Sequence, residues 1–146
     1  MSDFRRLSPT MLASPQIWPD DIAEAANQGV TLIINNRPDG ESPDEPQGPE
    51  IEARAREAGL DYLAIPIGSA GFSEPQVEAM QAAIGSSEGT VLAYCRSGTR
   101  STLLWSLAQA RAGEDTELIA SAAHQAGYDV SPVRPAMDVL SAQAQS

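Results

Sequence analysis

Residues 90–107 of the chain read TVLAYCRSGTRSTLLWSL, and this stretch decides the fold. The four residues before Tyr94 are mostly apolar, as in a buried strand, whereas residues 102–107 have the pattern of an amphipathic helix. We therefore predict a strand, a tight loop that begins at Cys95, and a helix. Loop amides and a helix N-terminus both stabilise negative charge, so this geometry favours a thiolate at Cys95.

The rest of the chain alternates short apolar segments with segments of helical periodicity. Besides the strand that ends at Tyr94, the pattern predicts one or two edge strands within 7–17 and strands at 30–35 and 60–67. Gly, Pro and capping residues delimit the expected helices, 20–28, 50–58, 73–85, 100–112, 116–126 and 132–142. This order predicts one α/β domain over residues 1–146, with a mainly parallel sheet of four or five strands flanked by helices.

The charge of the chain limits its partners. Its 146 residues carry a formal net charge of −11, and all nine positive residues are arginine. An acidic surface repels nucleic acid and anionic membranes, so we expect neither as a partner. The lack of lysine excludes a P-loop lysine and Schiff-base chemistry.

The single cysteine points to a free thiol. One cysteine allows no internal disulfide and no second thiol to resolve an oxidised Cys95. A free reactive thiol fits a reducing compartment. Residues 1–6 precede no long apolar run, and no segment approaches the roughly 20 apolar residues of a membrane span. We therefore expect a cytoplasmic protein. We also expect no metal or cofactor, and the one histidine, His124, has no companion residue with which to bind a metal ion.

Three loops follow predicted strands, and they contain the candidate site. They are residues 36–40, residues 68–72 and the loop that begins at Cys95. Ligands in parallel sheets bind beyond the carboxyl ends of the strands. The sequence therefore predicts a site where these three loops meet.

The motifs in these loops resemble one bacterial family. They are Asn35-Asn36-Arg37-Pro38-Asp39-Gly40-Glu41, the strand end Ile65-Pro66-Ile67, and Tyr94-Cys95-Arg96-Ser97-Gly98-Thr99-Arg100-Ser101. In this order and spacing the chain is similar, from about Leu7 to Leu140, to the phosphatase-like domain that also occurs fused to β-lactamase-like hydrolases. The resemblance implies the fold of dual-specificity cysteine phosphatases. It leaves the chemistry open between phosphatase and rhodanese-type sulfurtransferase.

The length of the Cys95 loop favours sulfur chemistry. Four residues separate Cys95 from Arg100, whereas cysteine phosphatases have five and usually place histidine before the cysteine, where this chain has Tyr94. A spacing of four residues resembles the rhodanese loop. A shorter loop supplies one fewer inward N–H group, so its cradle suits the outer sulfur of a persulfide better than a phosphoryl group.

The general acid gives a second test. Hydrolysis of a phosphate ester needs a proton for the leaving oxygen, usually from aspartate. The loop 68–72, where related phosphatases carry that acid, has no carboxylate. Sulfite leaves thiosulfate as an anion and needs no such acid. Asp39 could take the place of the missing acid. The absence of a carboxylate in this loop therefore counts against a phosphatase without excluding one.

The other loop residues have candidate roles in binding. We expect Arg100 to bind the substrate anion bidentately and Arg96 to point outward and meet substrate. Gly98 allows the tight turn. Ser97 and Thr99 would contribute backbone N–H groups, and Ser101 either donates a hydrogen bond to the Cys95 sulfur or caps the first helical turn.

Two residues of the second motif have open roles. Arg37 and Asp39 either line the mouth of the site or pair with each other in a rigid turn. The acidic run from Glu41 to Glu50 is expected to be a solvated loop, although it could also guard the site or meet a partner.

Three functions remain in order of preference. The leading hypothesis is a sulfurtransferase that carries a persulfide on Cys95, taken from thiosulfate or a small persulfide and passed to an external thiol. Fused relatives suggest a persulfide-oxidising metalloenzyme as a partner. The first alternative is a phosphatase with a Cys95 phosphoenzyme, and the second is a non-catalytic module that binds an anion or a phosphorylated partner. The leading hypothesis requires a Cys95 side chain open to solvent and amides that converge on its sulfur.

Overall fold

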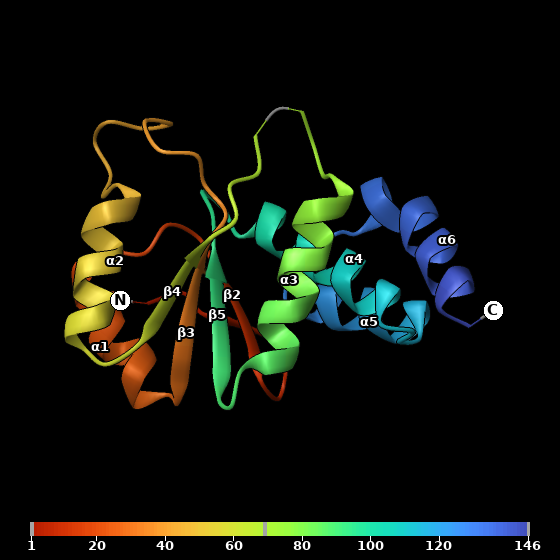
Figure 1. Cartoon of the computed structure of the whole chain (residues 1–146), viewed down its shortest axis with the longest axis horizontal. Coiled ribbons are helices and arrows are strands. Elements are labelled where there is room, and N and C mark those ends of the chain that lie inside the picture. Colours follow the sequence, from red (N-terminus) through yellow and green to blue (C-terminus); the bar gives the residue numbers. More distant parts are fainter. Residues whose placement is uncertain (1, 69, 146) are drawn as a thin grey trace.

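The computed structural model describes residues 2–68 and 70–145, which form a five-stranded sheet between two layers of helices (Figure 1). The strand order is β1-β2-β5-β3-β4, and only β1 runs antiparallel to its neighbour. The predicted α/β class and mainly parallel sheet are confirmed. In chain order, the strands are Arg5–Ser8, Met11–Ser14, Val30–Asn35, Asp61–Ala64 and Thr90–Tyr94.

The predicted edge segment 7–17 differs in part from the structure. It contributes two strands, but only β1 lies at an edge, because β2 pairs with β1 on one side and with β5 on the other. All four residues of β2 are buried. Pro9 and Pro15 lie outside both strands, so every residue of β2 keeps the backbone N–H that pairing with its neighbours requires.

Six helices cover the sheet, close to the predicted segments. Helices α1 and α2 lie on one face, and α3, α4, α5 and α6 lie on the other (Figure 1). The last predicted helix is divided into a short 3₁₀ turn, Ser131–Val133, and α6. In chain order, the helices are Pro19–Asn27, Gly48–Glu57, Glu74–Ser86, Thr99–Arg111, Thr116–Gln125 and Arg134–Ala144.

Each face of the sheet has its own apolar core. Successive strand residues point to opposite faces, so Ile33 packs under α1 and α2 while Ile34 packs under the larger helical layer. Both side chains are fully buried. The consecutive apolar residues Leu32, Ile33 and Ile34 are the pattern of a strand covered on both faces.

Helix α4 is more buried than an amphipathic pattern suggests. Every residue from Ser101 to Ala108 is buried, because α4 packs against the sheet and against α3, α5 and α6. Two of its buried hydroxyls bond to the backbone one turn earlier. Thr102 Oγ1 donates to the Gly98 carbonyl over 2.9 Å, and Ser106 Oγ donates to the Thr102 carbonyl over 2.8 Å. The burial of α4 fixes the helix whose first turn begins beside Cys95.

The predicted start of α3 is also confirmed. Ser73 is its N-cap, and Gln76 Oε1 accepts the Ser73 N–H over 2.8 Å, as in a capping box. Gln76 Nε2 donates to the carbonyl of Pro66 over 2.9 Å. The cap therefore also holds the segment that follows β4.

The carboxyl ends of β3, β4 and β5 lie at the same end of the sheet, where residues 36–47, 65–68 and 70–73 rise above it (Figure 1). This is the end at which the sequence predicts the site. Within residues 2–68 and 70–145, no helix combines the length and apolar character needed to cross a membrane.

Candidate active site

Cys95 is the first residue after β5, and Gly98 is the N-cap of α4. The loop between them is short enough that the Gly98 N–H donates to Cys95 Sγ over 3.1 Å. Gly98 adopts a left-handed φ of +91°, which favours glycine. The predicted order of strand, Cys95 loop and helix is confirmed, with a helix N-terminus next to the sulfur.

The segment that follows β2 is hydrogen-bonded to the same loop. The Cys95 N–H donates to the carbonyl of Ser14 over 3.3 Å, and the Gln16 N–H donates to the carbonyl of Arg96 over 3.3 Å. These bonds continue the parallel pairing of β2 and β5 past the ends of the strands. These two bonds therefore hold Cys95 and Arg96 against the segment that follows β2.

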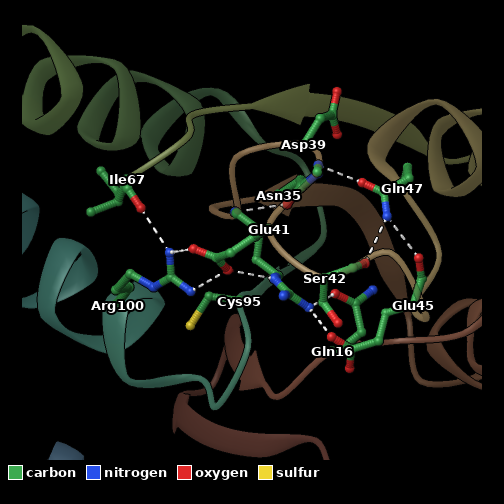
Figure 2. Close-up of polar contacts among 12 residues, drawn as sticks. Gln16, Asn35, Asp39, Glu41, Ser42, Glu45, Gln47, Ile67, Cys95 and Arg100 are labelled. Atoms are coloured by element: carbon green, nitrogen blue, oxygen red, sulfur yellow. Dashed lines mark hydrogen bonds and ion pairs between the residues drawn. The ribbon is translucent and has the colours of Figure 1, made fainter. Parts of the chain in front are cut away.

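The expectation of an open Cys95 side chain is wrong. Its exposed fraction is 0%. Arg100, from the first turn of α4, lies within electrostatic range of Cys95, and Glu41, from the loop after β3, bonds to Arg100 (Figure 2). In this structure the Cys95 sulfur is covered, so a ligand can reach it only if this part of the molecule rearranges.

Arg100 holds a carboxylate of this chain in the way expected for a substrate anion. Its Nη1 donates to Glu41 Oε2 over 2.9 Å, and its Nη2 donates to Glu41 Oε1 over 2.8 Å (Figure 2). Nη1 also donates to the carbonyl of Ile67 over 2.8 Å. The Ile67 carbonyl orients the guanidinium, and the Glu41 carboxylate occupies both of its terminal nitrogens. This is the geometry of bidentate anion binding.

Glu41 lies between two arginines. Arg37 Nε donates to Glu41 Oε1 over 2.8 Å, so this oxygen accepts from both Arg37 and Arg100. Hydrogen bonds from Arg100 and Arg37 lower the pKa of Glu41 to about 2. The acidic segment is therefore not simply solvated, because its first carboxylate is an ionised part of the site.

Arg37 is the buried anchor of this loop. Only 7% of the residue is exposed, and its Nη1 donates to Gln16 Oε1 over 2.8 Å and also to Glu45. That second contact lowers the pKa of Glu45 as well. Two carboxylates on one buried guanidinium fold the segment back over the sheet edge.

Asp39 faces away from this cluster. Its Oδ1 accepts the Gly48 N–H over 3.0 Å at the first residue of α2. Arg37 and Asp39 therefore bond to different partners rather than to each other, and the rigid-turn alternative is wrong. Of the two, Arg37 belongs to the Cys95 cluster, whereas Asp39 holds the start of a helix.

Ser101 does not serve the sulfur. Its hydroxyl donates to Asn36 Oδ1 over 2.7 Å, and both residues are fully buried. Asn36 Nδ2 donates to the carbonyl of Ile65 over 2.9 Å, and the Asn36 N–H donates to the carbonyl of Tyr94 over 2.9 Å. Asn36 thus ties together the three loops. The sequence reasoning missed this role, although a polar residue directly after a buried strand is a signal for it.

The remaining loop residues are exposed. The Thr99 N–H donates to Ser97 Oγ over 3.3 Å, so this amide serves a local turn at the start of α4 rather than the sulfur. Ser97 Oγ also donates to Thr99 Oγ1 over 3.0 Å. Arg96 is exposed, as expected for a side chain that points out of the loop. Across the described ranges, no group of His, Cys, Asp and Glu side chains is arranged to hold a metal ion.

Comparison with known proteins supports the family expected from the motifs. Residues 3–112 match the family model for the phosphatase-like domain of beta-lactamase hydrolase-like proteins. The chain belongs to this family. It is 37% identical over 125 residues to a beta-lactamase hydrolase-like protein of Xylella fastidiosa, and 36% identical over 108 residues to one of Agrobacterium fabrum.

These curated relatives are longer proteins. The matches cover 85% and 74% of this chain but only 29% and 25% of the two relatives. The chain therefore spans less than a third of their length.

Solved structures agree on the fold. A candidate phosphatase from Neisseria meningitidis is 31% identical and superimposes with a TM-score of 0.83, over 96% of this chain and 99% of that one. The protein Tk-PTP in its active form is 17% identical with a TM-score of 0.74, over 98% and 97%. The domain has the fold of dual-specificity and tyrosine phosphatases. These comparisons support phosphatase chemistry better than sulfur transfer.

Proposed function

We propose that the domain is a cysteine-dependent sulfurtransferase that carries sulfane sulfur on Cys95, once a rearrangement at the Glu41 contact opens the covered sulfur to its donor. The observation that carries the proposal is the state of Glu41 and Asp39, the two carboxylates of the motif after β3 that could act as a general acid. Glu41 has a pKa of about 2 and is held by two arginines, and Asp39 is bonded to the start of α2. Neither is placed to deliver a proton to a leaving alcohol at neutral pH. The leaving group that fits such a site departs as an anion.

Thiosulfate has such a leaving group. The Cys95 thiolate attacks the outer sulfur of thiosulfate and a new S–S bond forms. The S–S bond of thiosulfate breaks, and sulfite leaves with the electron pair. The Cys95 persulfide then passes its outer sulfur to cyanide or to an external thiolate, which restores the Cys95 thiolate. No net proton transfer is needed in either step, and the cycle predicts ping-pong kinetics.

Glu41 acts as a stand-in for the substrate anion. Its carboxylate places two oxygens on the fork of Arg100, as two oxygens of a sulfonate group would. For the donor to bind, Glu41 leaves Arg100, and its departure also uncovers Cys95. Glu41 keeps Arg37 as a partner in that state, so the displaced carboxylate remains charge-compensated.

Phosphatase activity is the second candidate, with the family and the Neisseria structure as its support. In that reaction Cys95 attacks phosphorus, the ester oxygen leaves, and water then hydrolyses the phosphoenzyme. It requires either an aryl ester, whose phenolate leaves without a proton, or an acid outside the residues discussed above.

One paired assay decides between the two. We expect the purified protein to transfer sulfur from thiosulfate to cyanide, and Cys95→Ser to lose this activity. Mass spectrometry should show one added sulfur on Cys95 after thiosulfate alone. Hydrolysis of an aryl phosphate with no sulfur transfer, again lost in Cys95→Ser, would reverse the order. Activity on neither substrate, with anion binding retained, would favour the non-catalytic module.

The partner follows from the acceptor chemistry. Because the chain has one cysteine, the second sulfur acceptor is external. The curated relatives carry a further, larger part beyond this domain. We propose a persulfide-oxidising metalloenzyme as the consumer of the transferred sulfur, tested by whether a glutathione persulfide made by this domain is oxidised by such an enzyme.

A further inference from the structure

One peptide unit in the Cys95 loop is bonded at both ends. The Gly98 N–H donates to Cys95 Sγ over 3.1 Å. The carbonyl of the same peptide, that of Ser97, accepts the hydroxyl of Tyr128 over 3.1 Å. In a planar trans peptide the N–H and C=O point in opposite directions. A donor that holds the carbonyl on the outer side therefore turns the N–H toward the sulfur.

Tyr128 is itself rigidly placed. It follows α5 after Gly127, whose φ of +93° ends the helix, and the Tyr128 N–H returns to the carbonyl of Ala123 over 2.9 Å. Only 6% of the residue is exposed. The guanidinium of Arg5, from β1, lies 5.1 Å from the centre of its ring. The hydroxyl thus reaches the loop from a fixed ring.

The Tyr128 hydroxyl also fits the shape of the loop. A Cβ at position 98 would overlap this hydroxyl, so the tyrosine occupies the space that a glycine leaves. Burial raises the pKa of Tyr128. The phenol therefore stays protonated and remains a donor throughout the pH range in which a thiol ionises.

We propose that Tyr128 is a positioning residue for the nucleophile, because its hydroxyl holds the Ser97–Gly98 peptide so that the Gly98 N–H stays on the Cys95 sulfur. The residue lies beyond positions 3–112, which match the family model. The inference rests on Cys95 as the nucleophile of the proposed function and holds for either transferred group.

The test is Tyr128→Phe, which keeps the ring and removes only the donor. Without it the peptide can rotate, and the thiolate loses its hydrogen bond. We expect the midpoint of the thiolate absorbance titration to rise by about one pH unit, since a hydrogen bond to a charged group has roughly that effect. The acid limb of the pH–rate profile should move by the same amount.

Two control variants separate this role from packing. Tyr62→Phe removes a phenol that bonds to Asn35 on β3, and Arg5→Met removes the cation over the Tyr128 ring but keeps the hydroxyl. In all three variants Arg100 and Glu41, the charged groups beside Cys95, are unchanged. Both controls should leave the midpoint within about 0.3 pH units, below the effect of one charged hydrogen bond.

The titration requires no substrate. A result that contradicts the role of Tyr128 can therefore be told apart from a result that contradicts the proposed function. An unchanged midpoint in folded Tyr128→Phe would overturn the proposal, as would an equal shift in all three variants. A shift confined to Tyr128→Phe supports it. If Tyr128→Phe does not fold, the Gly98 amide of the unaltered protein decides by NMR: it should titrate with the thiol, and an amide insensitive to that ionisation would overturn the proposal.

Discussion

The loop 95–98 and the segment 36–49 meet at the same sheet edge, but they are held in different ways. The Cys95 loop is anchored by main-chain bonds to its neighbours, by the left-handed Gly98 and by the buried α4. In the segment 36–49, ion pairs with Arg37 and Arg100 fix the side chains of Glu41 and Glu45. Under the proposed function, the first region keeps the Cys95 nucleophile in place, and the second can exchange the Glu41 carboxylate on Arg100 for the substrate anion.

The largest expected effect breaks the first region. Cys95→Ser keeps the size of the side chain and its hydrogen bond but replaces the nucleophile. Removal of a covalent nucleophile should lower kcat by at least about 10³-fold, measured by thiosulfate:cyanide transfer. The fold should survive, with an unaltered far-UV spectrum. Residual activity above one-tenth would show that another group carries the chemistry.

Arg100→Lys acts on the point where the two regions meet. Lysine keeps the charge but loses the planar fork, so two parallel bonds to the anion become one. We expect kcat/KM for thiosulfate to fall about 10- to 100-fold, in line with the loss of about 1.4 to 2.7 kcal/mol. Arg111→Lys on the same helix is the matched control and should change kcat/KM less than twofold. Equal activity of Arg100→Lys would mean that the fork does not hold substrate.

Glu41→Gln sharpens the comparison because it should improve binding. A neutral amide competes less well for Arg100, so we expect KM for thiosulfate to fall about threefold to tenfold, as expected when a displaceable charged hydrogen bond is weakened. Glu45→Gln, which touches Arg37 but not Arg100, is the control and should leave KM nearly unchanged. A higher KM in Glu41→Gln would indicate that Glu41 orients Arg100 rather than replacing the substrate.

Lowering the pH should give the smallest effect, a loss of stability in the segment 36–49 alone. It distinguishes the two regions without a mutation. The folded-state pKa of Glu41, about 2, lies below its usual value of 4.5. Its contribution to stability is therefore complete above pH 4.5 and is lost as the pH falls toward 2. Amide exchange in residues 36–49, corrected for intrinsic rates, should increase over this range, while Gly98 remains protected. Glu41→Gln should lack the step, and a step of equal size in that variant would assign it to another group.

Local sequence patterns predicted much of the fold for physical reasons. The strand at 30–35 is apolar and bounded by turn residues, and the structure has β3 at Val30–Asn35. Ser73 and Gln76 predicted the start of α3 because a capping box is satisfied within one turn of chain. The edge position assigned to the first strands was wrong for β2, because strand order depends on pairing partners far away in sequence.

The candidate site likewise has features that local sequence predicts and features that depend on tertiary contacts. By itself the sequence determined that a lone cysteine stands between a strand and a helix, with an arginine five positions later, because that arrangement depends only on local spacing. Only the tertiary structure decided that Glu41 occupies Arg100, that Ser101 serves Asn36 rather than the sulfur, and that Tyr128 lies behind Gly98. These contacts join residues 31 to 65 positions apart. Side-chain polar groups find such partners only after the packed sheet has brought their elements together, and a spacing pattern holds no record of that packing.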